Sequence, residues 1–392
     1  MYISKVRKCI TTALCSLMVF SMIPLENANA ADGKFVGNII ASSVPSSFGT
    51  YWNQVTPENA SKWGSAEPSR GNMNWGNVDL IYNYSRKNKI PFKFHTLVWG
   101  SQEPGWISGL SQSEQLAEVT EWIQAAGQRY PDAEFVDVVN EPLHAPASYR
   151  NALGGNGTTG WDWVVWSFQQ ARKAFPNSKL LINDYGIISD PNAARNYVKI
   201  INILKDKGLV DGIGIQCHCF NMDTVSTSTM KEVLDLLGAT GLPIYVSELD
   251  ITGDDTTQLA RYTEKFPVLY NYPSVKGITL WGYIQGQCWK ENTYLLTSSG
   301  AERPALQWLK TYLKQTPGTI KYGDVNGDNS IDAMDFAQFK KYLLNPSANP
   351  FPVSNGQKIA DLDGSGTVDV LDFALLKQYL LGKISKFPVD KA

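Results

Sequence analysis

Short apolar runs alternate with amphipathic stretches along most of the chain, from residue 33 to about residue 315. Segment 111–129, for example, places Leu116, Val119, Trp122 and Ile123 on one helical face, and 161–175 and 193–206 follow the same pattern. Alternating strands and helices predict an α/β fold, a (β/α)8 barrel over residues 31–315. No Gly-rich loop follows the first strand, which argues against a doubly wound parallel sheet. The eight runs predicted to be strands are 35–40, 51–55, 91–97, 134–140, 179–183, 211–217, 243–248 and 277–281.

The N-terminal segment has the composition of a targeting sequence. Lys5, Arg7 and Lys8 form a basic start, residues 10–23 form an apolar run, and Ala28-Asn29-Ala30 offers the small residues of a cleavage site. This order predicts a secretory signal peptide over residues 1–30, and therefore a secreted, extracellular protein. The apolar run is shorter than the ~20 residues that a membrane span needs, so we expect no membrane partner.

The pattern changes near residue 315, where a short linker, 316–321, precedes a tail, 322–392, that repeats itself. Asp335-Phe336 recurs 37 residues later as Asp372-Phe373. Tyr342-Leu343-Leu344 recurs in the same way as Tyr379-Leu380-Leu381. An internal duplication of this kind indicates two copies of one loop-helix unit.

Each copy of the repeat places oxygen-bearing residues at the spacing by which a 12-residue loop wraps Ca²⁺. Gly366 supplies the sharp turn of the second loop, and Asn329 takes that place in the first. We therefore predict two Ca²⁺ ions in the tail and no cofactor for catalysis. The candidate ligands are Asp324, Asn326, Asp328, Ser330 and Asp335 in the first loop and Asp361, Asp363, Ser365, Thr367 and Asp372 in the second, with Asp332 and Asp369 at the positions that often bind through water.

Both loops end on Asp rather than the usual Glu, and neither follows an obvious entering helix. These features make residues 322–385 resemble a dockerin, the small α-helical calcium module of clostridial cellulosomes. The resemblance implies a cohesin on a scaffoldin as partner. In that family the residue pairs at loop positions 10 and 11 contribute to partner choice, and here they are Ala333-Met334 and Val370-Leu371. Lys340, Lys341 and Lys377 are further candidates for that contact, with solubility as the alternative.

Two glutamates follow predicted strands at their C-terminal ends, where the active sites of such barrels lie. Glu141 follows the fourth strand in Asn140-Glu141-Pro142, and Glu248 ends the seventh in Ser247-Glu248-Leu249-Asp250. Two carboxylates on one rim suit hydrolysis of a glycosidic bond, because one protonates the departing oxygen while the other attacks the anomeric carbon. Two such displacements retain the configuration of the sugar.

The other strand ends carry amides, carboxylates, imidazoles and indoles, which bond to hydroxyls or stack on sugar rings. All twelve Trp lie between Trp52 and Trp308. The net charge of −2, from 35 Lys and Arg against 37 Asp and Glu, gives no reason to expect nucleic acid as a partner. Four of the Trp are interpreted as packing residues rather than sugar contacts: Trp63, Trp122, Trp161 and Trp166.

Together with Thr56-Pro57-Glu58-Asn59, the two glutamate motifs make residues 33–315 resemble glycoside hydrolase family 10, whose members are mostly endo-β-1,4-xylanases. The resemblance implies that Glu141 is the acid/base and Glu248 the nucleophile of a retaining hydrolase of xylan or arabinoxylan. It implies that His218, steadied by Asp250, bonds to Glu248. The remaining substrate-binding candidates are Asn140 at the 2-hydroxyl of the sugar being cleaved, Glu58, Asn59, Lys62, His95, Trp99, Gln102 and Gln216 on the glycone side, Tyr185 after the fifth strand, and Trp281 and Trp289 over the reacting sugar.

Two departures from the family pattern lie near the reacting sugar. Gly100 stands where the family often has a second His, and the loop 282–288 lacks the usual Thr-Asp. We expect the small Gly100 to widen the site for decorated xylan. Two other functions stay open, cleavage of another β-1,4-glycan and a non-catalytic carbohydrate-binding barrel. Outside the signal three cysteines remain, whose pairing the sequence leaves open: Cys217, Cys219 and Cys288.

Overall fold

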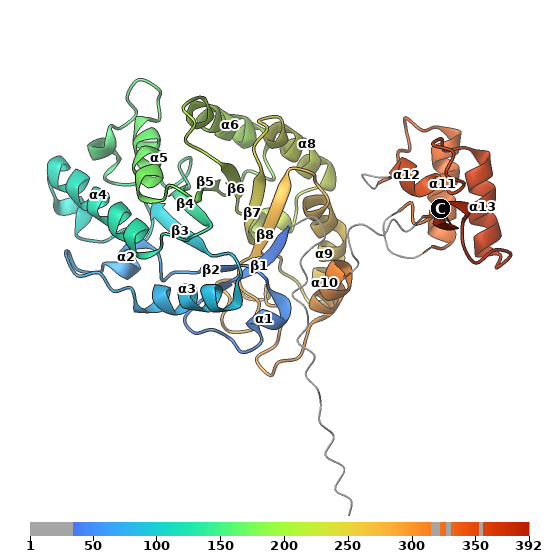
Figure 1. The fold of residues 1–392 in the computed structure, drawn as a ribbon, viewed down its shortest axis with the longest axis horizontal. Coiled ribbons are helices and arrows are strands. Elements are labelled where there is room, and N and C mark those ends of the chain that lie inside the picture. The colour runs from blue at the N-terminus through green and yellow to red at the C-terminus, as the bar shows by residue number, and fades with distance from the viewer. Residues whose placement is uncertain (1–33, 315–321, 327–330, 353–355, 392) are drawn as a thin grey trace, which may run out of the picture.

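The computed structural model describes residues 34–314, 322–326, 331–352 and 356–391 (Figure 1). The predicted signal peptide and linker lie outside these residues. So do two of the predicted calcium ligands, Asp328 and Ser330. Among the described helices, none is both long and apolar enough to span a membrane.

Eight parallel strands occupy the centre of the larger part of the chain (Figure 1). They are hydrogen-bonded in the order β2-β1-β8-β7-β6-β5-β4-β3, and an isolated parallel bridge between Val55 and Phe92 joins the two ends of this order. The strands therefore form a nearly closed barrel, which confirms the predicted (β/α)8 TIM barrel. Their bounds are β1 Phe35–Ile40, β2 Val55–Pro57, β3 Lys93–Val98, β4 Phe135–Asn140, β5 Lys179–Asp184, β6 Gly212–Ile215, β7 Ile244–Leu249 and β8 Val275–Leu280.

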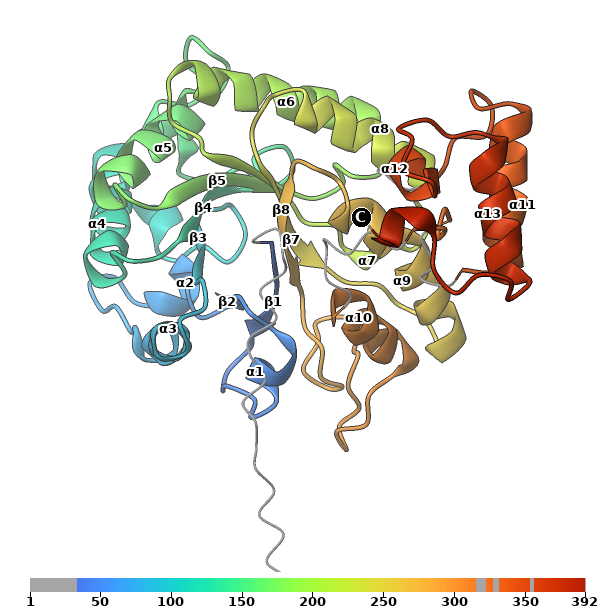
Figure 2. The same cartoon turned by 45° about the vertical axis from the view of Figure 1, so that its right-hand side comes forward.

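Helices follow most strands and surround the barrel (Figures 1 and 2). The predicted segments 111–129, 161–175 and 193–206 correspond to α4, α5 and α6, with ends that differ by two residues or fewer. The bounds are α1 Phe48–Tyr51, α2 Trp63–Ala66, α3 Gly76–Asn88, α4 Gln112–Arg129, α5 Asp162–Ala174, α6 Pro191–Asp206, α7 Cys219–Met222, α8 Thr227–Gly238, α9 Asp255–Tyr270 and α10 Pro304–Lys314, with short 3-10 turns η1 Ile107–Gly109 and η2 Arg150–Leu153.

Local sequence explains where the long helices begin. Ser111 accepts a hydrogen bond from the Glu114 amide, and the Glu114 carboxylate accepts one from the Ser111 amide, so α4 starts with a capping box. Asp190 accepts from two amides of the first turn of α6, and Pro191 occupies the first helical position, where its missing N–H costs nothing.

Aromatic side chains pack between the barrel and its helices on the β2–β3 side. The indole of Trp122 on α4 is stacked between Trp75, at 5.3 Å, and Trp63, at 5.9 Å. All three belong to the large core cluster or pack against it, as do Trp161 and Trp166. The packing role that the sequence assigned to four of these residues is therefore confirmed.

The second predicted strand, 51–55, is wrong. Residues 48–51 form the short helix α1, and the strand β2 begins only at Val55. Tyr51 and Trp52 favour a strand by propensity, but tertiary packing decides their conformation, because both rings contact Tyr283 of the loop after β8. On α4, Leu116 points partly to solvent, with 37% of its surface exposed, while Val119, Trp122 and Ile123 are buried.

The described residues of the tail form the helices α11 Ala333–Leu344, α12 Gly356–Ala360 and α13 Val370–Leu380, and the 3-10 turn η3 Pro388–Lys391. Helices α11 and α13 lie side by side (Figure 2). Its buried residues form a hydrophobic cluster of their own, around Phe339, Leu362 and Leu376, separate from the barrel core. In that cluster Phe336 and Phe373, which occupy equivalent positions in the two repeats, stack at 4.3 Å.

Candidate active site and calcium loops

The two candidate catalytic glutamates lie at the same end of the barrel. Glu248 is the last residue but one of β7, and Glu141 comes immediately after β4. Because the strands are parallel, their C-terminal ends meet at one rim. Glu141 has a φ of 54°, a left-handed conformation that is uncommon for a residue with a side chain. Gln102 and Cys217, at φ 49° and 60°, share this feature at the same rim, where strained backbone often accompanies function.

Glu248 is buried and held by two polar groups. Asn183 Nδ2 donates to its Oε1 at 2.7 Å, and His218 Nε2 donates to its Oε2 at 3.1 Å. Burial by itself raises the pKa of Glu248. The hydrogen bond from His218 and the electrostatic influence of His95, His218 and Lys93 outweigh burial and lower this pKa to about 2. The carboxylate is therefore ionised at neutral pH.

His218 connects Glu248 to a second carboxylate. Its Nδ1 donates to Asp250 Oδ2 at 3.0 Å, and the same oxygen accepts from Trp289 Nε1 at 2.5 Å. Burial lowers the pKa of His218, but the bonds to Asp250 and Glu248 outweigh burial and raise it to about 9. The protonated imidazole stabilises the ionised form of Glu248.

Glu141 has a different environment. Trp99 Nε1 donates to its Oε2 at 2.9 Å and Gln216 Nε2 to its Oε1 at 2.9 Å. Burial raises its pKa, the bond from Gln216 opposes this, and the negative charge of Glu248 raises the pKa further. The two glutamates thus have pKa values that are moved in opposite directions, which is the arrangement that separates an acid from a nucleophile.

Amides link the two glutamates. Asn183 Nδ2 bonds to both Glu248 and Asn140 Oδ1, the latter at 2.8 Å. Gln216 Nε2 lies 3.4 Å from the same Asn140 oxygen while it donates to Glu141. Asn183 was not singled out as a site residue from the sequence, although it occupies the strand end just before Tyr185.

A second polar group lies at the ends of β2 and β3. Lys62 Nζ donates to Asn59 Oδ1 and to Gln102 Oε1, both at 2.8 Å, and stands 5.0 Å from the centre of the Trp99 ring. Glu58 is 9% exposed, and burial raises its pKa against the opposing charge of Lys62. All five residues were predicted to bind substrate.

His95 and Trp281 lie at the base of the site, between the residues around the two glutamates and those around Lys62. His95 is buried, and its Nδ1 donates to Asp137 Oδ2 at 2.9 Å while Lys93 pairs with the same oxygen at 3.2 Å. The Trp281 ring contacts the His95 ring edge-on at 5.2 Å and is only 4% exposed. Trp289 is 43% exposed and lies 4.7 Å from the His218 ring, so it offers far more surface to a ligand than Trp281.

Three aromatic rings follow the ends of β4, β5 and β6. His144 stacks on Tyr185 at 4.1 Å, and Phe220 contacts both Tyr185, at 5.7 Å, and His218, at 5.6 Å. The sequence indicated only Tyr185. Phe220 was missed because a single Phe in α7 has no distinguishing pattern, yet 48% of its surface is exposed. His144 donates from Nδ1 to Asp184 Oδ1 at 2.7 Å, which raises its pKa.

The three cysteines of the barrel are free thiols in the structure. Cys217 and Cys219 are buried beside His218, whose two ring nitrogens bond to carboxylates. The pairing that the sequence left open therefore does not occur among these described residues.

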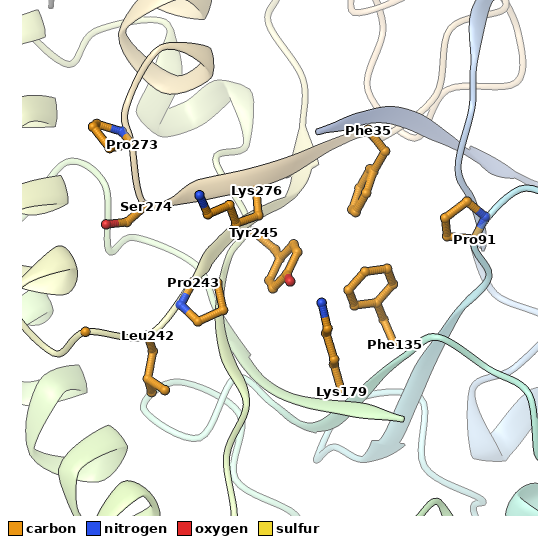
Figure 3. A pocket seen from close by; sticks show the side chains of 11 residues that line it. Phe35, Pro91, Phe135, Lys179, Leu242, Pro243, Tyr245, Pro273, Ser274 and Lys276 are labelled. Carbon is orange, nitrogen blue, oxygen red and sulfur yellow. The ribbon is translucent and has the colours of Figure 1, made fainter. Parts of the chain in front are cut away.

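A pocket of about 630 Å³ lies at the opposite end of the barrel (Figure 3). Phe35, Phe135 and Lys179 begin their strands, and Figure 3 shows these side chains around the pocket together with Tyr245. The three rings pack within 6.0 Å of one another and are almost fully buried. This pocket therefore marks the aromatic plug that closes the N-terminal end of the barrel, remote from both glutamates.

The second predicted calcium loop brings three carboxylates together. Oxygens of Asp361, Asp363 and Asp372 lie within 4.8 Å of one another. Asp361 Oδ1 is buried and has no hydrogen-bond partner, whereas Oδ2 accepts from the Gly366 amide at 2.8 Å. Oxygen ligands with a free, buried lone pair fit Ca²⁺, which prefers such ligands.

The described part of the first loop repeats the geometry of the second. Asp335 accepts from the amides of Asn326 and Asp332 at 3.1 and 2.9 Å, and Asp372 accepts from those of Asp363 and Asp369 at the same distances. In both copies this Asp also closes the capping box that starts the following helix. Asp324 is nearly buried beside them.

The rim of this TIM barrel carries two carboxylates whose pKa values are moved in opposite directions, together with amides, a lysine and indoles. This combination is typical of the glycoside hydrolases. The comparisons with known proteins agree. A family model described as glycosyl hydrolase family 10 matches residues 25–312, and one described as dockerin type I domain matches residues 322–381. The chain belongs to glycosyl hydrolase family 10 and carries a C-terminal dockerin type I domain, as both resemblances predicted.

Several proteins that resemble this chain are named as xylanases. Endo-1,4-beta-xylanase B of Cellvibrio japonicus is 44% identical over 290 residues, which cover 72% of this chain and 46% of that protein. Endo-1,4-beta-xylanase 2 of Claviceps purpurea is 32% identical over 271 residues, covering 68% of this chain and 79% of its own. The crystal structure of native xylanase 10B from Thermotoga maritima superposes with a TM-score of 0.63 at 26% identity, covering 74% of this chain and 96% of that one. The match thus spans less than half the length of the Cellvibrio protein.

Proposed function

We propose that the barrel is a retaining endo-1,4-β-xylanase, in which Glu141 is the acid/base and Glu248 the nucleophile. The observation that carries this proposal is the opposite displacement of the two pKa values, that of Glu248 to about 2 and that of Glu141 upward. This arrangement keeps Glu248 ionised at neutral pH and favours the protonated form of Glu141 relative to an ordinary glutamate.

The reaction proceeds in two displacements. Glu141 gives its proton to the glycosidic oxygen while a Glu248 oxygen attacks the anomeric carbon, so the bond to the leaving sugar breaks and an ester to Glu248 forms. Glu141, now ionised, takes a proton from water, whose oxygen attacks the same carbon and releases Glu248. His218 and Asn183 hold the two Glu248 oxygens throughout, and Gln216 and Trp99 orient Glu141.

The sugar chain lies across the rim in this proposal. Glu58, Asn59, Lys62 and Gln102 bind its glycone side, with Trp289 above the reacting sugar and Asn140 at its 2-hydroxyl. On the other side of the glutamates, His144, Tyr185 and Phe220 offer an aromatic surface for the sugars that leave, which suits an enzyme that cleaves within a polymer. Lys62 and Trp289 are the walls that would exclude the C6 hydroxymethyl of glucose.

Reducing-sugar release from xylan, arabinoxylan and carboxymethylcellulose tests the substrate class. We expect release from the two xylans and little from the cellulose derivative. Equal rates on both polymer types would favour the alternative, a hydrolase of another β-1,4-glycan. Glu141→Gln and Glu248→Gln should each abolish release from xylan, and full activity in either variant would remove that residue from its role.

For the tail, we propose calcium-dependent docking to a scaffoldin cohesin outside the cell. Met334, Val370 and Leu371 are 60–69% exposed although they are apolar, and they occupy positions 10 and 11 of the two loops. Exposed apolar side chains of this size commonly mark a surface for a protein partner. Co-migration of the chain with a type I cohesin on a native gel, and its loss in EDTA, would support this role, whereas binding that persists in EDTA would contradict it.

A further inference from the structure

Gly100, which follows Trp99 at the end of β3, lies against the loop that follows Glu141. A β-carbon on Gly100 would stand 2.4 Å from the carbonyl oxygen of Pro146 and 2.6 Å from that of Ala145. Both are backbone atoms, so the clash could be relieved only if the loop moved. The Gly100 amide also donates to Ala145 O at 2.9 Å. The space beside Gly100 is therefore filled by backbone, and the expected widening of the site by this glycine is wrong.

The same loop fixes the backbone of Glu141. The amides of His144 and Ala145 donate to Glu141 O at 3.1 and 2.8 Å, so the segment that touches Gly100 is one tight turn away from the acid. On its other side the turn is anchored to β5, because Asp184 accepts from the Leu143 amide at 2.9 Å and from His144. The Glu141 amide itself donates to Asn183 O at 2.7 Å.

The turn is thus held from two sides, by β5 through polar bonds and by β3 through a close backbone contact that only glycine permits. Since Glu141 has a left-handed backbone conformation, its position depends on these external contacts. We infer that Gly100 is a positioning residue for Glu141: by allowing the 145–146 backbone to touch β3, it sets where the acid stands relative to the glycosidic oxygen. This inference rests on the proposed role of Glu141.

A second glycine provides a contrasting case. A β-carbon on Gly64 in α2 would lie 2.5 Å from the Gln102 carbonyl oxygen and 3.0 Å from that of Glu103. Gly64 therefore spaces α2, which follows Lys62, from the loop that carries Gln102. Gly105 is the matched control, because it belongs to the same β3 loop and a β-carbon there would have no atom within 4 Å.

The test compares two substrates in Gly100→Ala, Gly64→Ala and Gly105→Ala. Phenyl β-xylobioside needs a proton on its leaving group, whereas 2,4-dinitrophenyl β-xylobioside does not. We expect Gly100→Ala to lower the kcat on the phenyl substrate by about tenfold or more, since general acid catalysis typically contributes ~10²–10⁴, and to leave the dinitrophenyl rate of bond cleavage nearly unchanged. Gly64→Ala should raise KM for both substrates equally, and Gly105→Ala should match the wild type.

The ratio of the two rates does not depend on how much of the protein is folded, so a general loss of structure would not change it. Pro146→Gly loosens the loop without adding a β-carbon at residue 100, and it should change the ratio in the same direction. If Gly100→Ala does not fold, the ratio in Pro146→Gly tests the inference instead. A wild-type ratio in the variants that fold would overturn the inference. Failure of the wild type to cleave either substrate would instead overturn the proposed function and the inference together.

Discussion

At the scale of single residues, the site depends on one protonated imidazole. His218 stands between Asp250 and Glu248, and its hydrogen bonds to these two carboxylates raise its pKa to about 9. The bond to Glu248 in turn helps to lower the pKa of Glu248 to about 2. Trp289 bonds to the same Asp250 oxygen. The residue proposed to lie over the reacting sugar and the support of the proposed nucleophile therefore share one carboxylate.

The first prediction concerns the pH dependence of activity. In His218→Gln the charge that holds Glu248 ionised is lost, while burial remains and raises its pKa. We expect the acidic limb of kcat/KM on xylan to move from near pH 2 to a value at or above 4.5, the ordinary pKa of a glutamate. The basic limb, which follows loss of the Glu141 proton, should move little. An unchanged acidic limb, measured over pH 3–8, would contradict the role of His218.

The interaction of His218 with Glu248 also predicts how the stability of the protein depends on pH. The raised pKa of His218 contributes stability that is present below 6.5, its ordinary value, and is lost as the pH rises through about 9. The lowered pKa of Glu248 contributes stability that is present above 4.5 and is lost as the pH falls toward 2. The difference in Tm between the wild type and His218→Gln should therefore be largest between pH 4.5 and 6.5. A difference that is constant from pH 3 to 9 would disprove the linkage.

Phe220 supplies a test of the side that binds the leaving sugars. An aromatic contact is worth ~0.5–1.5 kcal/mol, so Phe220→Ala should raise KM for xylohexaose by roughly 2- to 10-fold. Aryl xylobiosides place no sugar there and serve as the internal control. An equal rise in KM on both substrates would show that the ring supports His218 rather than the substrate.

At the scale of elements, the sequence predicted whether a segment is a helix or a strand better than it predicted where that segment begins and ends. Seven of the eight strands overlap their predicted ranges closely, since buried parallel strands are continuous apolar runs. Residues 51–55 failed because Tyr51 and Trp52 pack on Tyr283, a partner more than 200 positions away, which no local pattern contains. Glu141 and Glu248 were predictable because strand ends define the rim. Phe220 and the contact of Gly100 with residues 145–146 were not, because they depend on how loops approach one another. Asn183 carries the same strand-end signal as the glutamates, since it is the last residue but one of β5.

The helix α4 allows a prediction at this scale. Ser111→Ala removes the side-chain half of its capping box and should lower the free energy of unfolding by about 1 kcal/mol, measured by urea denaturation of the barrel. Gln112→Ala, at an exposed position in the same turn but outside the box, should have little effect. Activity on xylan below the transition should stay unchanged in both variants. Equal destabilisation by the two substitutions would show that the cap contributes nothing specific.

At the scale of the whole molecule, the barrel and the tail have separate hydrophobic clusters. Asp335 and Asp372 each close a helix cap and also belong to a predicted calcium loop, so ion binding and helix initiation are coupled within the tail. The glutamates of the barrel share no described hydrogen bond with these loops.

Calcium removal should therefore act on one part only. We expect EDTA to reduce the helical circular dichroism of the tail and to leave kcat/KM on xylan within about twofold, because catalysis draws on no metal. Adding back excess Ca²⁺ should restore the signal. A parallel loss of activity that Ca²⁺ reverses would show that the tail regulates the enzyme.

The stack of Trp63, Trp122 and Trp75 can also serve as an intrinsic spectroscopic probe of folding. All twelve indoles belong to the barrel, and Trp122 lies 5.9 Å from Trp63 and 5.3 Å from Trp75, nearly parallel to them at interplanar angles of 13° and 3°. Transition dipoles at such separations couple, so the folded barrel should show an exciton band that disappears when its helices part. The tail contributes no indole fluorescence. Melting of the barrel can therefore be followed separately from that of the tail in the full-length chain without any label.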